Sequence, residues 1–370
     1  MIKRVPAVIL LSILTISANA QIQKTANNRV YVDEDYQYTE VARRDRGVKE
    51  QLEKGDRLYE SGDYRGAVDA FSIAAQLDPS VFLAQLKLGI AQLYLPDFKS
   101  ALNAFENAVR LDESSATAWH FLGYSFYNLK KNDEAARCYL RALEVDQKLG
   151  VTWNNLGQVY LENDKLADAE AAFIKALTFE PDSMQPVNGL CVAYARLKKS
   201  EQAVSFCGKS RAAKRTLMAT YYLAWSYLDL QRFPEAIEVL NECIRLAPKN
   251  PDVYLALTEG YFHLKRYQEA MSFAEKALSL NPDLQAPYAS MGRIYFEMKK
   301  PKEAKRLFEK ALAIQPESAS ARYNLALTCL ALNQKECARE QYTILKTVEP
   351  VLSTQLLDQI YGSKIVRLVK

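Results

Sequence analysis

Small and large apolar residues recur along this chain at a fixed interval. Alanines stand 34 residues apart and, after one step of 33, continue in the same rhythm: Ala67, Ala101, Ala135, Ala169, Ala203, Ala236, Ala270, Ala304 and Ala338. Four residues after each alanine comes a large or apolar residue: Phe71, Phe105, Tyr139, Phe173, Cys207, Leu240, Ala274, Phe308 and Tyr342. Self-similarity at a period of roughly 20–50 residues is the signature of a repeat architecture.

The spacing within each unit predicts two antiparallel helices joined by a short turn. Glycines such as Gly89, Gly123 and Gly157 fall on the first helix, and the alanines fall on the second, where the two backbones approach closely. The large residues then fill the gap to the next pair. Prolines end the second helix of several units, because proline cannot continue a helix: Pro79, Pro181, Pro248, Pro282, Pro316 and Pro350.

Two units carry the pattern most completely. The fourth has Trp153, Leu156, Gly157, Tyr160, Ala169, Phe173, Ala176 and Pro181; the eighth has Tyr288, Gly292, Tyr295, Ala304, Phe308, Ala311 and Pro316. The fourth resembles the tetratricopeptide repeat at every signature position. The resemblance implies an all-α fold, a right-handed superhelical solenoid of about nine tetratricopeptide-type helical hairpins plus a C-terminal capping helix. We expect units to start near residues 48, 82, 116, 150, 184, 217, 251, 285 and 319.

The first twenty residues have the three parts of a secretory signal peptide. Lys3 and Arg4 precede an apolar run over residues 5–17, and Ala18-Asn19-Ala20 is a small-x-small cleavage site. The run is about 13 residues long, short of the ~20 that span a bilayer. We therefore predict a cleaved signal at 1–20 and an exported chain, with the bacterial periplasm favoured over other secreted destinations and no integral membrane segment after cleavage.

The remaining boundaries follow from the repeat. Residues 21–47 are polar and are expected to be disordered, residues 48–352 form the nine repeats, and residues 353–370 form a capping helix, with Ser353 as its N-cap, and a short basic tail. The fifth unit, near 184–216, is irregular: it is one residue short, and Arg215 stands where proline is expected. Either this unit divides the array into two blocks of four, or it is simple drift.

Two cysteines of the fifth unit fall level with each other in an antiparallel hairpin. Cys191 takes the place of a small residue on the first helix, and Cys207 lies opposite it on the second. Export implies an oxidising compartment, so a Cys191–Cys207 disulfide is one interpretation; two small buried hydrophobic side chains is the other. A second pairing, Cys329 with Cys337, is less favoured because Cys337 can point outward.

Composition argues against catalysis, metal binding and nucleic-acid binding. The 370-residue chain has a formal charge of +4 and two histidines, His120 and His263. That charge is too balanced for a nucleic-acid partner. The sequence has no phosphate loop, nucleophile triad, zinc signature or dinucleotide fingerprint. We expect no cofactor, no metal, no catalytic residue and a function in protein binding.

The resemblance implies that the first helices line a concave groove. The candidate groove residues are His120, Tyr124, Tyr127, Asn154, Asn155, Gln158, Asn188, Tyr221, Trp225 and Arg293, with Glu259 beside them. Asn154 and Asn188 lie 34 residues apart, and their amides can hydrogen-bond an extended peptide; ordinary solvated asparagines are the alternative. Tyrosine and tryptophan are typical of binding hot spots.

Three functions remain open at this stage. The first is an exported adaptor or scaffold that holds a peptide or partner protein, within a multiprotein cell-envelope assembly or secretion complex. The second is a self-associating structural component of an envelope complex. The third is an accessory subunit that presents substrate to a separate enzyme.

Overall fold

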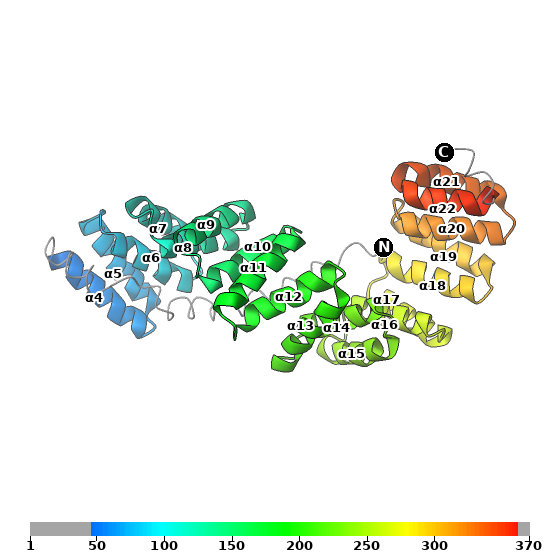
Figure 1. Ribbon diagram of the computed structural model, residues 1–370, viewed down its shortest axis with the longest axis horizontal. Coiled ribbons are helices and arrows are strands. Elements are labelled where there is room, and N and C mark those ends of the chain that lie inside the picture. Colours follow the sequence, from blue (N-terminus) through cyan, green and yellow to red (C-terminus); the bar gives the residue numbers. More distant parts are fainter. Residues whose placement is uncertain (1–45, 362–370) are drawn as a thin grey trace. The chain divides into compact units, whose positions relative to one another are not determined.

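The computed structural model describes residues 46–361, which form nineteen α-helices and no strand (Figure 1). The all-α repeat solenoid predicted from the sequence is confirmed. The chain divides between Ala213 and Lys214 into two compact units, called here the N-terminal unit (46–213) and the C-terminal unit (214–361). The proposed signal peptide, the polar segment up to residue 45 and the tail 362–370 lie outside the described residues.

The N-terminal unit contains hairpins one to five. Their helices are α4 (Arg46–Glu60) and α5 (Tyr64–Leu77), α6 (Phe82–Tyr94) and α7 (Phe98–Leu111), α8 (Ala116–Asn128) and α9 (Asn132–Val145), α10 (Gly150–Glu162) and α11 (Leu166–Phe179), and α12 (Met184–Arg196) and α13 (Ser200–Ala213). The irregular fifth hairpin therefore belongs to this unit. None of the described helices is long and apolar enough to cross a membrane.

The C-terminal unit contains hairpins six to nine and a final helix. Their helices are α14 (Leu217–Asp229) and α15 (Phe233–Leu246), α16 (Pro251–His263) and α17 (Tyr267–Leu280), α18 (Gln285–Glu297) and α19 (Pro301–Ile314), α20 (Ala319–Ala331) and α21 (Lys335–Val348), and α22 (Pro350–Tyr361). The expected N-cap at Ser353 is wrong. Helix α22 begins at Pro350, which suits a first helical position, and the Ser353 N–H already donates to the Glu349 carbonyl at 3.1 Å.

The eighth and twenty-fourth residues of each unit share one buried space between the two helices. In hairpin four, a methyl group added at Gly157 would come within 2.7 Å of Cε1 of Phe173, so glycine is required beside that ring. The same holds in hairpin two, where the Gly89 approach to Phe105 is 2.6 Å. Close packing of this kind tolerates no extra carbon.

Consecutive hairpins are joined by a side chain at the fourth position of the unit. Trp119 Nε1 donates to the Glu113 carbonyl at 2.9 Å, and Trp153 Nε1 donates to Gln147 at 2.9 Å. In the C-terminal unit, the Tyr254 hydroxyl makes the equivalent bond at 2.8 Å. The bond satisfies a carbonyl in the connection, which explains why different aromatic residues with a polar tip serve there.

The turn inside each hairpin passes through the left-handed backbone region. The turn residue has φ of 62° at Lys130, 60° at Asp164 and 58° at Lys265, and Gly62 takes the equivalent place at 84°. This conformation lets the chain reverse direction between two helices. The next residue is often basic and lies over an aromatic ring of the first helix, as Lys165 does at 5.9 Å from the Tyr160 ring centroid.

Candidate functional site

A row of side chains runs across the first helices of the C-terminal unit. Trp225, Glu259 and Arg293 are each the ninth residue of their unit, on α14, α16 and α18, and each is partly exposed. We call these three residues the C-terminal row. Arg293 donates from Nη1 to Glu259 Oε2 at 2.9 Å and from Nη2 to Oε1 at 3.3 Å. Its guanidinium lies 4.4 Å from the Phe262 ring centroid. Direct contact between Glu259 and Arg293 shows that these positions face each other across neighbouring hairpins.

Glu259 is shared with a second partner. His263 Nε2 lies 2.9 Å from Glu259 Oε1, one helical turn along α16. The imidazole also stacks on the Phe233 ring, with centroids 4.8 Å apart and planes at 2°. The side chains of Glu259 and Arg293 remain 21% and 34% exposed, so the pair is held in place and is still accessible to a ligand. Such a cluster offers acceptors, donors and an aromatic surface together.

His120 is buried instead of lining an open groove. It is 3% exposed, and its Nδ1 lies 2.8 Å from Thr152 Oγ1, so it joins hairpins three and four. Burial lowers the pKa of His120 to about 4, which keeps the ring neutral at pH 7. This residue is part of the packing between repeats and is withdrawn as a ligand contact.

The two tyrosines of hairpin three also make contacts within the protein. Tyr124 is buried, and burial raises its pKa to about 12. Tyr127 donates its hydroxyl to the Glu162 carboxylate of hairpin four, and burial followed by the nearby Glu162 charge raises its pKa. Tyr124 is therefore corrected to a packing residue, and Tyr127 is only partly exposed.

The amides predicted to line the groove differ in accessibility. Asn154 and Asn155 are buried, and Asn154 Nδ2 donates to Asn155 Oδ1 at 3.3 Å. The prediction that both present an open amide to a ligand is therefore wrong. Asn188 is partly exposed, but its Oδ1 accepts a hydrogen bond from Ser210 Oγ at 2.6 Å. Gln158 is partly exposed. The 34-residue register of Asn154 and Asn188 therefore does not form a ladder of open amides.

Tyr221 is a support for the C-terminal row and not a contact surface. It is 2% exposed, and its ring centroid lies 6.1 Å from that of Trp225 in an edge-to-face arrangement. Burial raises the pKa of Tyr221. Of the predicted groove residues in this unit, Trp225, Glu259 and Arg293 remain accessible.

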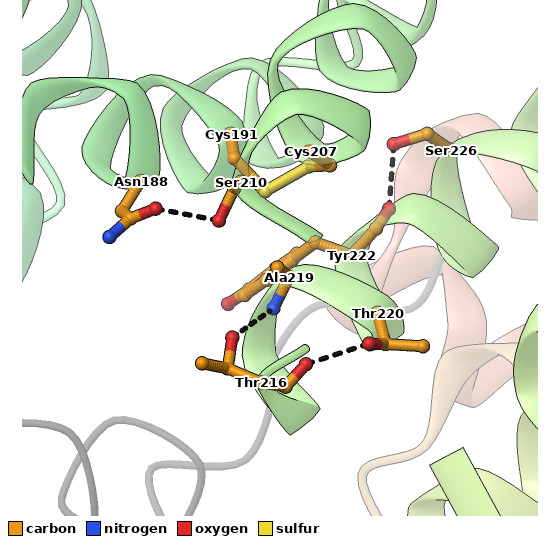
Figure 2. Close-up of a disulfide and its surroundings, with 9 residues drawn as sticks. All are labelled: Asn188, Cys191, Cys207, Ser210, Thr216, Ala219, Thr220, Tyr222 and Ser226. Atoms are coloured by element: carbon orange, nitrogen blue, oxygen red, sulfur yellow. Dashed lines mark hydrogen bonds between the residues drawn. A yellow bond between two sulfur atoms is a disulfide. The ribbon is translucent and has the colours of Figure 1, made fainter. Parts of the chain in front are cut away.

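Hairpin five is closed by a disulfide (Figure 2). Cys191 of α12 and Cys207 of α13 are bonded, with Cα atoms 4.6 Å apart, close to the Asn188–Ser210 hydrogen bond. Cys329 and Cys337 of hairpin nine are bonded as well, with Cα atoms 5.9 Å apart, although that pairing was less favoured from the sequence. Cys337 is only partly buried, yet its side chain turns inward to reach Cys329. No group of three or more metal-ligating side chains occurs within residues 46–361.

Comparisons with known families agree with this geometry. Family models described as tetratricopeptide repeat match residues 52–99, 86–148, 138–171 and 227–294. A model described as the second ARM domain of tetratricopeptide repeat protein 21 matches residues 265–361. The repeats of this chain are tetratricopeptide repeats.

Several solved structures are similar to this chain at low sequence identity. The crystal structure of the APC/C hetero-tetramer Cut9-Hcn1 gives a TM-score of 0.52 at 16% identity, covering 85% of this chain and 76% of that chain. A tetratricopeptide repeat protein from Parabacteroides merdae gives 0.40 at 17%, covering 77% and 99%. A thermophilic one from Thermus thermophilus gives 0.42 at 21%, covering 49% and 99%. No protein of curated function matches this sequence.

Two members of the site escaped the sequence analysis. His263 contacts Glu259 and Phe233 stacks on His263, but neither occupies a tetratricopeptide signature position on its helix. The spacing of Glu259 and His263, four residues apart on one predicted helix, was the available signal. The stacking on Phe233 depends on how α15 packs beside α16, and spacing along the sequence does not reveal it.

Proposed function

We propose that this tetratricopeptide repeat protein is an exported, non-catalytic adaptor that holds a partner protein or an extended peptide against its first helices. Proteins built from these repeats are generally protein-interaction scaffolds. The observation that carries the proposal is the C-terminal row, in which Trp225, Glu259 and Arg293 stand 34 residues apart and partly exposed on successive first helices.

The chemistry of the row suits a peptide backbone. Each peptide unit carries one donor and one acceptor, and a carboxylate beside a guanidinium supplies one group for each. The Glu259–Arg293 pair keeps both groups aligned before the partner arrives, which lowers the ordering cost of binding. Trp225 supplies the apolar anchor that binding hot spots use most.

Export is supported by two separate features. The N-terminal segment 1–20 has the composition of a signal peptide. The described residues hold two disulfides, Cys191–Cys207 and Cys329–Cys337, which persist in oxidising compartments and are rare in the cytosol. We propose the bacterial periplasm as the location and a cell-envelope assembly or secretion complex as the setting.

Site-specific photo-cross-linking tests the binding surface in the cells that make the protein. Benzoylphenylalanine replaces Trp225 in one variant and Glu275, an exposed residue of the second helix α17, in the control. We expect an adduct with a distinct partner at position 225 and none at position 275. Adducts at both positions, or none at 225, contradict the proposal, and an adduct of twice the chain mass indicates self-association instead.

Two further measurements complete the test. Once the partner is purified, Trp225→Ala should weaken binding by about thirtyfold, the effect of losing a hot-spot residue worth about 2 kcal/mol, while Glu275→Ala leaves it unchanged. Export is tested by intact-mass analysis of protein from the native host. A chain that begins at Gln21 is expected, and one that retains residues 1–20 contradicts cleavage.

A further inference from the structure

Hairpin three carries a pocket that the C-terminal row does not involve. The pocket lies between α8 and α9, has a volume of about 320 Å³, and is lined by Trp119, Phe126, Glu134, Arg137, Cys138 and Arg141. Its volume is near the lower end, about 300 Å³, of pockets that hold small ligands. All six lining residues belong to the N-terminal unit, so the pocket is complete within it (α8 and α9 in Figure 1).

The apolar part of this pocket occurs at fixed positions of the repeat. Trp119, Phe126 and Cys138 are the fourth, eleventh and twenty-third residues of their unit. In hairpin seven the same positions hold Tyr254, Tyr261 and Phe273. The two hairpins can therefore be compared residue by residue.

Hairpin seven shows what this space accepts. The Phe273 ring stacks on Tyr261, with centroids 5.3 Å apart and planes at 19°, and lies 6.4 Å from Tyr254 at 28°. In hairpin five of the N-terminal unit, Phe206 at the same position lies 5.3 Å from Tyr194 with planes at 50°, and Val187 stands where hairpin seven has Tyr254. Hairpin three has the two flanking rings of the seventh, but Cys138 has no ring to place between them.

Cys138 leaves an apolar floor and adds no charge. It is not part of a disulfide, and burial raises the pKa of its thiol to about 12, so it stays protonated at neutral pH. A protonated buried cysteine behaves as a small hydrophobic side chain. The two flanking side chains, Trp119 and Phe126, keep part of their surface exposed above this floor.

The pocket is lined by two arginines and one glutamate. Arg141 lies 5.8 Å from the Trp119 ring centroid and is paired with Glu144 at 2.6 Å. Lys131 lies 5.7 Å from the Phe126 ring centroid. Arg137 is exposed and forms no ion pair with any residue of the described range 46–361. Glu134 and Glu106 are the negative charges that act on Cys138. A carboxylate beside the incoming group would pair with Arg137.

From these observations we infer that the hairpin-three pocket is a second docking site, which receives an aromatic side chain of a partner protein flanked by an acidic residue. The ring would take the place that Phe273 occupies in hairpin seven, between Trp119 and Phe126. The surface is independent of the first-helix row, so it gives the protein a second point of attachment to the same partner or to another one. Two weak attachments joined in one chain bind more tightly than either alone.

The test measures peptide binding before and after a substitution places a ring of the protein itself in the pocket. The probe is a tripeptide with 4-fluorophenylalanine between two aspartates, and its binding to the full mature chain is observed by ¹⁹F NMR. A matched peptide has lysines in place of the aspartates. A fluoroacetylated peptide with a central alanine shows how much binding occurs without a ring. We expect the acidic aromatic peptide to bind with a dissociation constant of about 1 mM, as suits one anchor residue. Cys138→Phe should weaken it by at least about tenfold, because the new ring occupies the space as Phe273 does in hairpin seven.

A second variant keeps the test valid if Cys138→Phe does not fold. Arg137→Glu alters an exposed side chain and should reverse the preference between the acidic and the basic aromatic peptide. Trp225→Ala should leave binding of all three peptides unchanged, which separates this site from the C-terminal row. Equal binding of the alanine peptide, unchanged binding in a folded Cys138→Phe variant, no reversal in Arg137→Glu, or no binding at about 5 mM overturns the inference.

Discussion

The two units fill the same repeat positions in different ways. In the N-terminal unit, hairpins one to four place a glycine on the first helix against an aromatic ring on the second, as Gly157 and Phe173 do. In the C-terminal unit, hairpin eight keeps this pair as Gly292 and Phe308, whereas hairpin six has Ala224 with Leu240 and hairpin seven has Thr258 with Ala274, all of them buried. Either helix can supply the atoms that fill the space between the two helices.

In hairpin five, a covalent bond joins the two helices at these same positions. Cys191 and Cys207 occupy the positions of the glycine and the ring, and their Cα atoms are 4.6 Å apart. A disulfide there replaces the packing that an aromatic ring supplies in the four preceding hairpins. We expect a glycine–ring pair, a pair of smaller apolar side chains and a disulfide to be interchangeable at these two positions, provided that both residues change together.

Removing the cross-link should have the largest effect. A disulfide that closes a loop of about 16 residues contributes about 3 kcal/mol, so Cys191→Ser with Cys207→Ser should lower the free energy of unfolding of the N-terminal unit by that amount. Urea unfolding followed by tryptophan emission in a Trp225→Phe background measures it, because Trp119 and Trp153 then report on this unit alone. Cys138→Ser, in the same unit, controls for loss of a buried thiol.

A second pair of substitutions replaces the disulfide of hairpin five with a glycine and a packed ring. Cys191→Gly with Cys207→Phe recreates the pair found in hairpin four and should recover about 1.5–3 kcal/mol through burial of the ring. If this variant is no more stable than the double serine variant, then hairpin five differs from its neighbours in backbone geometry and the pairs are not interchangeable.

Overpacking hairpin seven should lower the free energy of unfolding of the C-terminal unit by about 2 kcal/mol. Ala274→Phe adds a ring to a space that Thr258 already fills, and overpacking of this kind costs roughly 1–3 kcal/mol. Adding Thr258→Gly makes room and should restore most of the stability, although glycine inside a helix costs about 1 kcal/mol. Thermal unfolding of both single variants and of the double variant gives the coupling energy; additive effects would rule out a shared space.

Mild acid should weaken the N-terminal unit through His120. Its pKa is about 4 in the folded chain against a usual 6.5, so the unfolded chain takes up the proton first. The stabilisation is complete above pH 6.5 and declines as the pH falls toward 4. Between pH 7 and pH 5.5 the loss should be about 1 kcal/mol. His120→Gln should remove this dependence, and an equal decline in both proteins would assign it to other groups.

The sequence predicted the fold better than it predicted the site. The alanine period gave the hairpins, because close helix contacts leave a strict spacing in the sequence. The boundary of α22 was misplaced since Pro350 was read as the end of hairpin nine, whereas a proline can also open a helix. The Cys191–Cys207 geometry followed from positions level in a hairpin; the orientation of Cys337 could not be deduced that way.

The groove residues were harder to predict, because the exposure of a side chain depends on the residues that pack around it. His120 and Asn154 occupy the same position of consecutive units, and both are buried. His120 finds its partner, Thr152, 32 residues away, on the first helix of the next hairpin. How closely neighbouring first helices approach depends on the packing of whole hairpins, and no short pattern in the sequence specifies it. Trp225 and Arg293 stand at the ninth position of their units instead, and both are partly exposed.

The left-handed turn residues have a consequence for how this chain can change over generations. Lysine stands at φ 62° in one turn and aspartate at φ 60° in the next, so the side-chain identity there is nearly free. Valine, isoleucine and threonine are excluded, because branching at Cβ is incompatible with that backbone. Neutral drift at these sites is therefore confined to side chains without a branch at Cβ, and the exception is hairpin two, where Pro96 stands at φ 27°.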